Sequence, residues 1–140
     1  MKKYKVGYTT GVFDLFHIGH LNIFKKAKEY CEYLIVGVTT DEETYNLKKK
    51  YPIITFEERI EIVKNIKQVD EVFVEENSNK LLAWEKLHFD VIFKGDDWKG
   101  SVLWNNYEKN FNKLNVNIIY FPYTEGTSSS KLRDILEKLL

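Results

Sequence analysis

Short apolar runs alternate with amphipathic stretches along the 140 residues of this chain. Runs apolar enough to form buried strands occupy residues 6–9, 34–38, 72–74, 91–93 and 116–121. Apolar residues recur at helical spacing in 21–30, 56–66, 80–87, 107–114 and 128–139. Because consecutive parallel strands need a crossover, this alternation predicts a parallel sheet covered by helices on both faces. We expect a single domain over residues 1–140: an α/β, doubly wound, Rossmann-like domain with a five-stranded parallel sheet in the order 3-2-1-4-5, flanked by helices.

Composition excludes several kinds of partner. The 21 Lys and Arg balance the 21 Asp and Glu, so we expect no nucleic-acid partner, because duplex binding draws on excess positive charge. No apolar run approaches membrane-spanning length, and the N-terminus lacks the apolar core of a signal peptide, which predicts a cytoplasmic protein without membrane insertion. The single Cys31 forms no internal disulfide and is expected to be a buried apolar filler.

Polar side chains that suit phosphate groups follow the ends of four predicted strands. They occupy residues 10–20, 39–50, 94–98 and 123–131. The second segment runs into a predicted loop, 46–52, which holds Lys48, Lys49 and Lys50. The carboxyl ends of parallel strands lie at one edge of the sheet, where doubly wound folds bind ligands. The sequence therefore predicts one anion-binding site at that edge.

The segment His17-Ile18-Gly19-His20 places two histidines where the first strand hands over to a helix. A helix start attracts anions, and a glycine lets a phosphate approach the backbone. Imidazoles there can donate to charge that develops on a phosphoryl group. Two other interpretations stay open: structural histidines at a helix start, or a zinc site, for which no ligand cluster completes a tetrahedral set.

The other polar segments also have plainer interpretations. Ser128 to Ser130 can simply cap the last helix, and the lysine run can be a solvated loop. Asp96 and Asp97 can form a turn before Trp98. Thr55 and Glu58 have the spacing of a capping box at the start of a helix.

Two motifs resemble those of a known family. Residues 11–20, G-V-F-D-L-F-H-I-G-H, resemble the H-x-G-H motif of the cytidylyltransferase-like nucleotidyltransferases, and residues 124–129, T-E-G-T-S-S, resemble that family's R-T-E-G-I-S-T motif. Residues 57–59 and 94–100 resemble the conserved blocks between them. The resemblance covers nearly the whole chain in the same order, and it is greatest to the members that act on glycerol 3-phosphate.

The resemblance implies an enzyme of the EC 2.7.7 type. It would transfer CMP from CTP to a small phosphorylated alcohol, with glycerol 3-phosphate as the best match, and release pyrophosphate. The acceptor phosphate would attack the α-phosphorus in line, without a covalent enzyme intermediate. The product would be a CDP-activated alcohol for cell-surface polymer or lipid synthesis. The resemblance also implies Mg2+ bound with the triphosphate, and a homodimer.

The resemblance also assigns roles to residues. His17, His20 and Lys50 would be catalytic, the histidines donating to the α- and β-phosphate oxygens and Lys50 contacting the nucleotide phosphates. Lys48 and Lys80 would bind the acceptor phosphate. Asp14 would organise the phosphates or the metal ion. The remaining nucleotide-binding positions would be Thr10, Gly11, Val12, Phe13, Gly19, Arg59, Gly95, Asp97, Tyr123, Thr124, Glu125, Gly126, Thr127, Ser128, Ser129 and Ser130.

Three departures from the family pattern bear on the site. Tyr123 stands where the motif has arginine, and tyrosine can donate a hydrogen bond or stack but cannot neutralise charge. Thr127 and Ser129 replace the usual isoleucine and threonine. Residues 101–112 are longer than the relatives need. We expect a helix packed on the sheet or against a dimer partner, and the alternative is a lid or wall of the acceptor pocket.

The sequence leaves other substrates and activities open. The acceptor can be phosphocholine, phosphoethanolamine, a polyol phosphate or a sugar phosphate. Trp84, Trp98 and Trp104 are the tryptophans that could contact a quaternary ammonium group. Adenylyl transfer from ATP is a further variant. A nucleotide-binding module without catalysis is the alternative from a different class, supported by the missing arginine alone.

Overall fold

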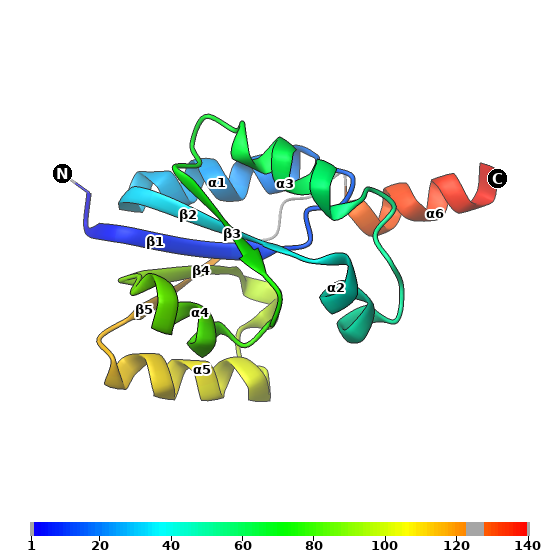
Figure 1. Ribbon diagram of the computed structural model, residues 1–140. Coiled ribbons are helices and arrows are strands. Elements are labelled where there is room, and N and C mark those ends of the chain that lie inside the picture. Colours follow the sequence, from blue (N-terminus) through cyan, green and yellow to red (C-terminus); the bar gives the residue numbers. More distant parts are fainter. Residues whose placement is uncertain (1, 123–127, 140) are drawn as a thin grey trace.

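The computed structural model describes residues 2–122 and 128–139, and it confirms the predicted fold (Figure 1). The five strands are parallel and lie in the order β3-β2-β1-β4-β5. They are β1 (Tyr4–Gly11), β2 (Cys31–Thr39), β3 (Glu71–Glu75), β4 (Val91–Gly95) and β5 (Asn117–Phe121). The helices are α1 (Ile18–Tyr30), α2 (Asp41–Lys48), α3 (Phe56–Lys64), α4 (Lys80–Leu87), the short 3-10 helix η1 (Asp96–Trp98), α5 (Val102–Lys113) and α6 (Ser129–Leu139).

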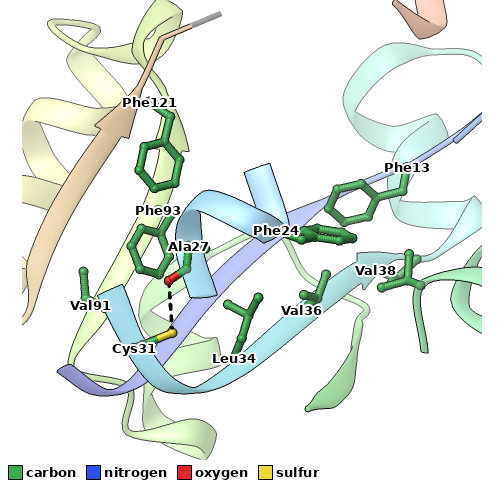
Figure 2. Close-up of a cluster of buried hydrophobic side chains, with 11 residues drawn as sticks. Phe13, Phe24, Ala27, Cys31, Leu34, Val36, Val38, Val91, Phe93 and Phe121 are labelled. Atoms are coloured by element: carbon green, nitrogen blue, oxygen red, sulfur yellow. Dashed lines mark hydrogen bonds between the residues drawn. The ribbon is translucent and has the colours of Figure 1, made fainter. Parts of the chain in front are cut away.

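Each face of the sheet has its own hydrophobic core. Helices α1 and α3 cover one face, and α4 and α5 cover the other (Figure 1). Successive strand residues point to opposite faces, so Val36 joins the first core and Ile35 the second. Figure 2 shows the first core, in which Phe24 of α1 lies over β2 and Phe93 stacks on Phe121 with ring centroids 5.3 Å apart. Burial on both faces explains why the strands are nearly continuous apolar runs.

Cys31 occupies the place expected of it. It is fully buried at the start of β2, and its Sγ lies 3.4 Å from the carbonyl oxygen of Ala27 (Figure 2). Burial raises the pKa of this thiol, so it stays protonated and packs as an apolar group.

Helix α2 was not predicted. The loop expected over 46–52 begins only after Lys48, because α2 runs to that residue. Its sequence is polar, so the helix lacks an apolar stripe. Two local features form it: the Thr40 side chain accepts a hydrogen bond from the Glu43 N–H, and three acidic residues occupy the first turn.

Two helix starts differ from expectation. Thr55 is the N-cap of α3, but its hydroxyl donates to the Glu58 carboxylate at 3.4 Å and accepts no backbone N–H, so the predicted capping box is wrong. Helix α5 begins at Val102 rather than at residue 107. Trp104 and Tyr107 are buried on the second core, which confirms that this segment packs as a helix on the sheet. Among the described residues, no helix has the length and apolar character needed to cross a bilayer.

Arg59 of α3 ties together the loops that leave the sheet. Its guanidinium, in a side chain 1% exposed, donates to the carbonyl oxygens of Val12 (2.6 Å), Thr39 (2.8 Å) and Ile54 (2.9 Å). It also pairs with Asp41 at 2.7 Å. The four acceptors come from the loop after β1, the end of β2, the start of α2 and the segment before α3. In this structure Arg59 therefore contacts protein groups and positions these loops, and its role on the nucleotide side stays a prediction.

Replacing Arg59 by Met should destabilise the fold. The variant leaves the Asp41 carboxylate and three carbonyl oxygens without their donor, so we expect the free energy of unfolding to fall by about 3 to 5 kcal/mol. Urea unfolding followed by circular dichroism measures this. Lys64→Met, on the exposed end of the same helix, should change stability by only about 0.5 kcal/mol. A loss below about 1 kcal/mol in Arg59→Met would contradict the assignment.

Candidate active site

The carboxyl ends of the strands open into three adjoining hollows of about 370, 380 and 420 Å³. The Asp14 hollow lies among the loop after β1, residues 48–52 and the start of α6. The histidine hollow lies among the start of α1, η1 and the start of α6. The lysine hollow lies over the ends of β1, β2 and β3, between α2 and α5. Each has the size of a small-molecule site.

Neighbouring hollows share wall residues. His20 lines both the Asp14 and the histidine hollow, Lys48 lines both the Asp14 and the lysine hollow, and Lys94 lines both the histidine and the lysine hollow. Two ligands bound in different hollows would therefore meet at these side chains.

The two histidines form the capping box of α1. His17 is the N-cap, and its Nδ1 accepts the Gly19 N–H at 3.0 Å. The Nδ1 of His20 accepts the His17 N–H at 3.2 Å. Because a backbone N–H can only donate, both Nδ1 atoms are unprotonated, and each neutral ring carries its proton on Nε2. The sequence motif therefore fixes the tautomer of both rings.

Burial keeps both imidazoles neutral. It lowers the pKa of His20 to about 3, with a further lowering from His17 and from Lys48 that the Asp14 carboxylate opposes. Burial also lowers the pKa of His17. The Nε2 of His20 lies 3.5 Å from the Ser129 hydroxyl, which donates to the carbonyl oxygen of Asp14 at 2.5 Å. Near neutral pH the pair offers two N–H donors without adding net charge.

The loop before α1 is held by an aromatic anchor. Phe13 and Leu15 have positive φ values of 55° and 49°, a conformation that costs non-glycine residues energy. The Phe13 ring is buried against His20 and Phe24, with centroids 5.3 and 5.1 Å apart. This packing holds the strained backbone and places the His20 ring.

Asp14 links this loop to the lysine-bearing segment. Its two carboxylate oxygens accept the N–H groups of Ile53 (2.8 Å) and Ile54 (2.9 Å), and Arg133 of α6 lies 3.7 Å away. Within residues 2–122 and 128–139, no group of three His, Cys, Asp or Glu side chains could hold a metal ion. Asp14 thus serves as a loop tie here, these residues do not form a ready metal site, and its metal role stays a prediction.

Glu75, at the end of β3, gathers a buried polar cluster at the floor of the lysine hollow. Its side chain accepts hydrogen bonds from the hydroxyls of Tyr8 (3.1 Å), Thr10 (2.5 Å) and Thr39 (3.3 Å). It also pairs with the ammonium of Lys80 at 3.0 Å. Burial and the adjacent Glu75 carboxylate raise the pKa of Tyr8 far above its usual range. The Lys80 ammonium therefore lines the lysine hollow in a fixed position, with its charge already paired with Glu75.

Lys94 lies in the predicted phosphate-binding segment 94–98, but no individual role was predicted for it. It is the fourth residue of β4, and its Nζ lies 5.0 Å from the centroid of the Trp98 ring and 5.7 Å from that of Trp104. Burial, with help from Lys80, lowers the pKa of Lys94 to about 8. Its place at a predicted strand end was the available signal. Thr39 and Trp98 also line the hollows and lie in predicted phosphate-binding segments, and Trp104 and Tyr107 line the lysine hollow from the segment 101–112, where a pocket wall was the alternative expectation. Glu75 and Arg133 line the hollows from positions outside every predicted phosphate-binding segment.

Most of the predicted site residues come together at the three hollows. Those that line at least one hollow are Thr10, Gly11, Val12, Phe13, Asp14, His17, Gly19, His20, Lys48, Lys50, Lys80, Gly95, Asp97, Ser128, Ser129 and Ser130. Arg59 lies beneath them. Tyr123, Thr124, Glu125, Gly126 and Thr127 lie outside the described residues.

The low pKa of His20 has a consequence for stability. Between about pH 3 and pH 6.5 the unfolded chain protonates this histidine and the folded chain does not, so the free energy of unfolding falls as the pH drops through that range. His20→Asn keeps an acceptor for the His17 N–H and removes the titrating ring. We expect the stability lost between pH 7 and pH 4.5 to be smaller in the variant by about 2 kcal/mol. Urea unfolding at each pH measures this, and identical pH dependences would contradict the buried, neutral assignment.

Comparisons with known proteins agree on one family. The cytidylyltransferase-like family model matches residues 8–135. Glycerol-3-phosphate cytidylyltransferase of Bacillus spizizenii is 38% identical over 133 residues, covering 94% of this chain and 96% of that protein. The protein of the same name from Bacillus subtilis is 36% identical over 134 residues, covering 90% and 92%. An FAD synthase of Thermococcus sibiricus is 33% identical over 141 residues, covering 99% and 95%.

A solved structure shares the fold. The lipopolysaccharide core biosynthesis protein from Thermoplasma volcanium superposes with a TM-score of 0.72 at 24% identity, covering 89% of this chain and 99% of that one. The family match spans the histidine pair, the lysines and the start of α6. The chain is thus a member of the cytidylyltransferase-like family of nucleotidyltransferases.

Proposed function

We propose that this enzyme transfers CMP from CTP to glycerol 3-phosphate and releases pyrophosphate. One observation carries the proposal: a hollow with two neutral N–H donors at a helix start adjoins a hollow lined by Lys48, Lys80 and Lys94. The first suits the phosphates of a nucleotide and the second suits the phosphate of an acceptor. Relatives named for this activity, 36% and 38% identical over most of the chain, support the choice of substrates.

The reaction is a single in-line displacement at the α-phosphorus. An oxygen of the acceptor phosphate forms the new bond to phosphorus, and the bond to the bridging oxygen of pyrophosphate breaks. The attacking group is already an anion near neutral pH, so the step needs no general base. The protein supplies orientation and neutralisation of the charge on the phosphorus oxygens.

The histidines act as donors rather than as acids. The Nε2–H groups of His17 and His20 donate to the phosphate oxygens, and the capping hydrogen bonds hold both rings in place before the nucleotide arrives. Lys50, at the Asp14 hollow, contacts the nucleotide phosphates. Lys48 and Lys80 hold the acceptor phosphate, with Lys80 fixed by Glu75.

Magnesium, oligomeric state and location complete the proposal. Mg2+ would accompany the triphosphate and offset its charge, bound by phosphate oxygens rather than by a cage of protein ligands. A homodimer and a cytoplasmic location stay predictions; analytical ultracentrifugation and cell fractionation test them.

Adenylyl transfer from ATP is the second candidate. It is favoured by the Thermococcus sibiricus relative named FAD synthase, which matches 99% of this chain. Pyrophosphate release with CTP or ATP and Mg2+, in the presence of glycerol 3-phosphate, phosphocholine, phosphoethanolamine, a sugar phosphate or flavin mononucleotide, separates the two candidates. We expect turnover with CTP and glycerol 3-phosphate. Turnover with ATP and none with CTP would overturn the cytidylyl assignment.

Removing one histidine donor should slow the reaction without unfolding the protein. His17→Asn keeps an N-cap side chain and loses the Nε2–H donor. We expect kcat to fall about 100- to 1000-fold with a smaller change in the KM for CTP. The third histidine, His88, caps the far end of α4 in a left-handed conformation that asparagine also adopts. His88→Asn is therefore a matched control, and near-normal kcat in His17→Asn would contradict the assigned role.

A further inference from the structure

The ammonium of Lys94 lies at the boundary between the two substrate hollows. It lines both the histidine hollow and the lysine hollow, as Trp98 also does. Trp98 is partly exposed, whereas Trp104 is buried on α5. Lys94 thus stands where an acceptor phosphate in the lysine hollow would face a nucleotide in the histidine hollow.

Lys94 is one of two lysines that line the lysine hollow without a bonded carboxylate among the described residues, the other being Lys48. Glu75 is the carboxylate lining that hollow, and it is paired with Lys80. Among residues 2–122 and 128–139, no carboxylate oxygen lies within 4.0 Å of the Lys94 Nζ. Lys80 is offset by Glu75, and Asp97 is a more distant carboxylate that faces Lys94. The ammonium groups of Lys94 and Lys48 both line the hollow and can face the dianionic phosphate of a phosphate monoester.

The same ammonium occupies the aromatic faces that a cationic ligand would need. Quaternary ammonium groups bind over tryptophan rings within about 6 Å of the centroid. Here the Lys94 Nζ lies 5.0 Å from the Trp98 centroid and 5.7 Å from the Trp104 centroid. A trimethylammonium group would have to displace Lys94 or lie against a like charge.

We propose that Lys94 selects the acceptor: its ammonium, between Trp98 and Trp104, binds the phosphate of an acceptor built on an uncharged alcohol and excludes acceptors that carry a quaternary ammonium group. This rests on the proposed function, because it assigns the lysine hollow to the acceptor. It disfavours phosphocholine, one of the acceptors left open by the sequence, because the Lys94 ammonium would repel the trimethylammonium group. The ammonium remains a cation near neutral pH, since its lowered pKa is about 8.

Binding measurements test the role of Lys94 without turnover. Tryptophan fluorescence follows the titration of glycerol 3-phosphate and of phosphocholine into the wild type, Lys94→Met, Lys94→Arg and Lys99→Met. Lys99 is the matched control, since it lies five residues further on and contacts Tyr120 outside the hollows. We expect Lys94→Met to bind glycerol 3-phosphate about 10- to 100-fold more weakly than the wild type, with a smaller preference for it over phosphocholine. Lys94→Arg should bind glycerol 3-phosphate more tightly than Lys94→Met does.

Kinetics and pH supply a readout that a purely structural role would not move. In Lys94→Met the KM for the acceptor should rise while the KM for CTP stays the same. The groups that face Lys94 are Lys80 of α4, Lys48 of α2, Asp97 of η1 and Glu75 of β3. Deprotonation of Lys94 above about pH 8 should weaken acceptor binding in the wild type but not in Lys94→Arg, whose guanidinium keeps its proton.

Several outcomes would overturn the proposal. They are unchanged glycerol 3-phosphate affinity in Lys94→Met, an unchanged preference over phosphocholine, or a raised KM for CTP alone. Lys94→Gln serves as the neutral variant if Lys94→Met shows a lowered midpoint of thermal unfolding. A wild type that binds glycerol 3-phosphate but uses only ATP would refute the proposed function and leave the Lys94 result to be judged on binding.

Discussion

The site depends on a buried cation, Arg59, that binds four protein groups. The Arg59 guanidinium joins the loop after β1, the end of β2, the start of α2 and the segment before α3. A buried guanidinium is costly unless its donors find acceptors, so each of these segments is held where it can supply one. The same loops carry the wall of the Asp14 hollow. Arg59 therefore contributes to the site by fixing the positions of the segments that line it.

The other polar groups divide between framework and binding. The carboxylates of Glu75 and Asp14 accept hydrogen bonds from hydroxyls and backbone N–H groups and pair with nearby cations. The Nδ1 atoms of His17 and His20 accept N–H groups at the start of α1, so the proton of each ring is on Nε2, which in His20 lies 3.5 Å from the Ser129 hydroxyl. The charge left for substrates resides on lysines around the rim. Such an arrangement suits the binding of phosphates and the stabilisation of charge that develops on them.

Much of the site could be predicted because the fold brings strand ends together. Once alternation and apolar runs indicate a parallel sheet, His20, Lys80, Gly95 and Ser129 must lie near one edge, although they are far apart in the chain. The prediction missed α2 because that helix is polar. Its N-cap and the acidic residues of its first turn stabilise it, and it has no apolar stripe that a sequence pattern could reveal. The prediction failed for Thr55, because the choice between a backbone and a side-chain partner depends on geometry of less than an ångström.

The sequence by itself determined the alternation of strands and helices, the position of the histidine pair at a helix start and the family, since these follow from local patterns and motif order. Only the tertiary structure decided what Arg59, Asp14 and Lys94 contact. Arg59 and Asp14 find their partners 5 to 119 residues away in the chain. Lys94 lies between rings that different elements supply. A charged residue has the same letter whether its charge is buried in a hydrogen-bonded network or open to a ligand, and packing alone distinguishes the two.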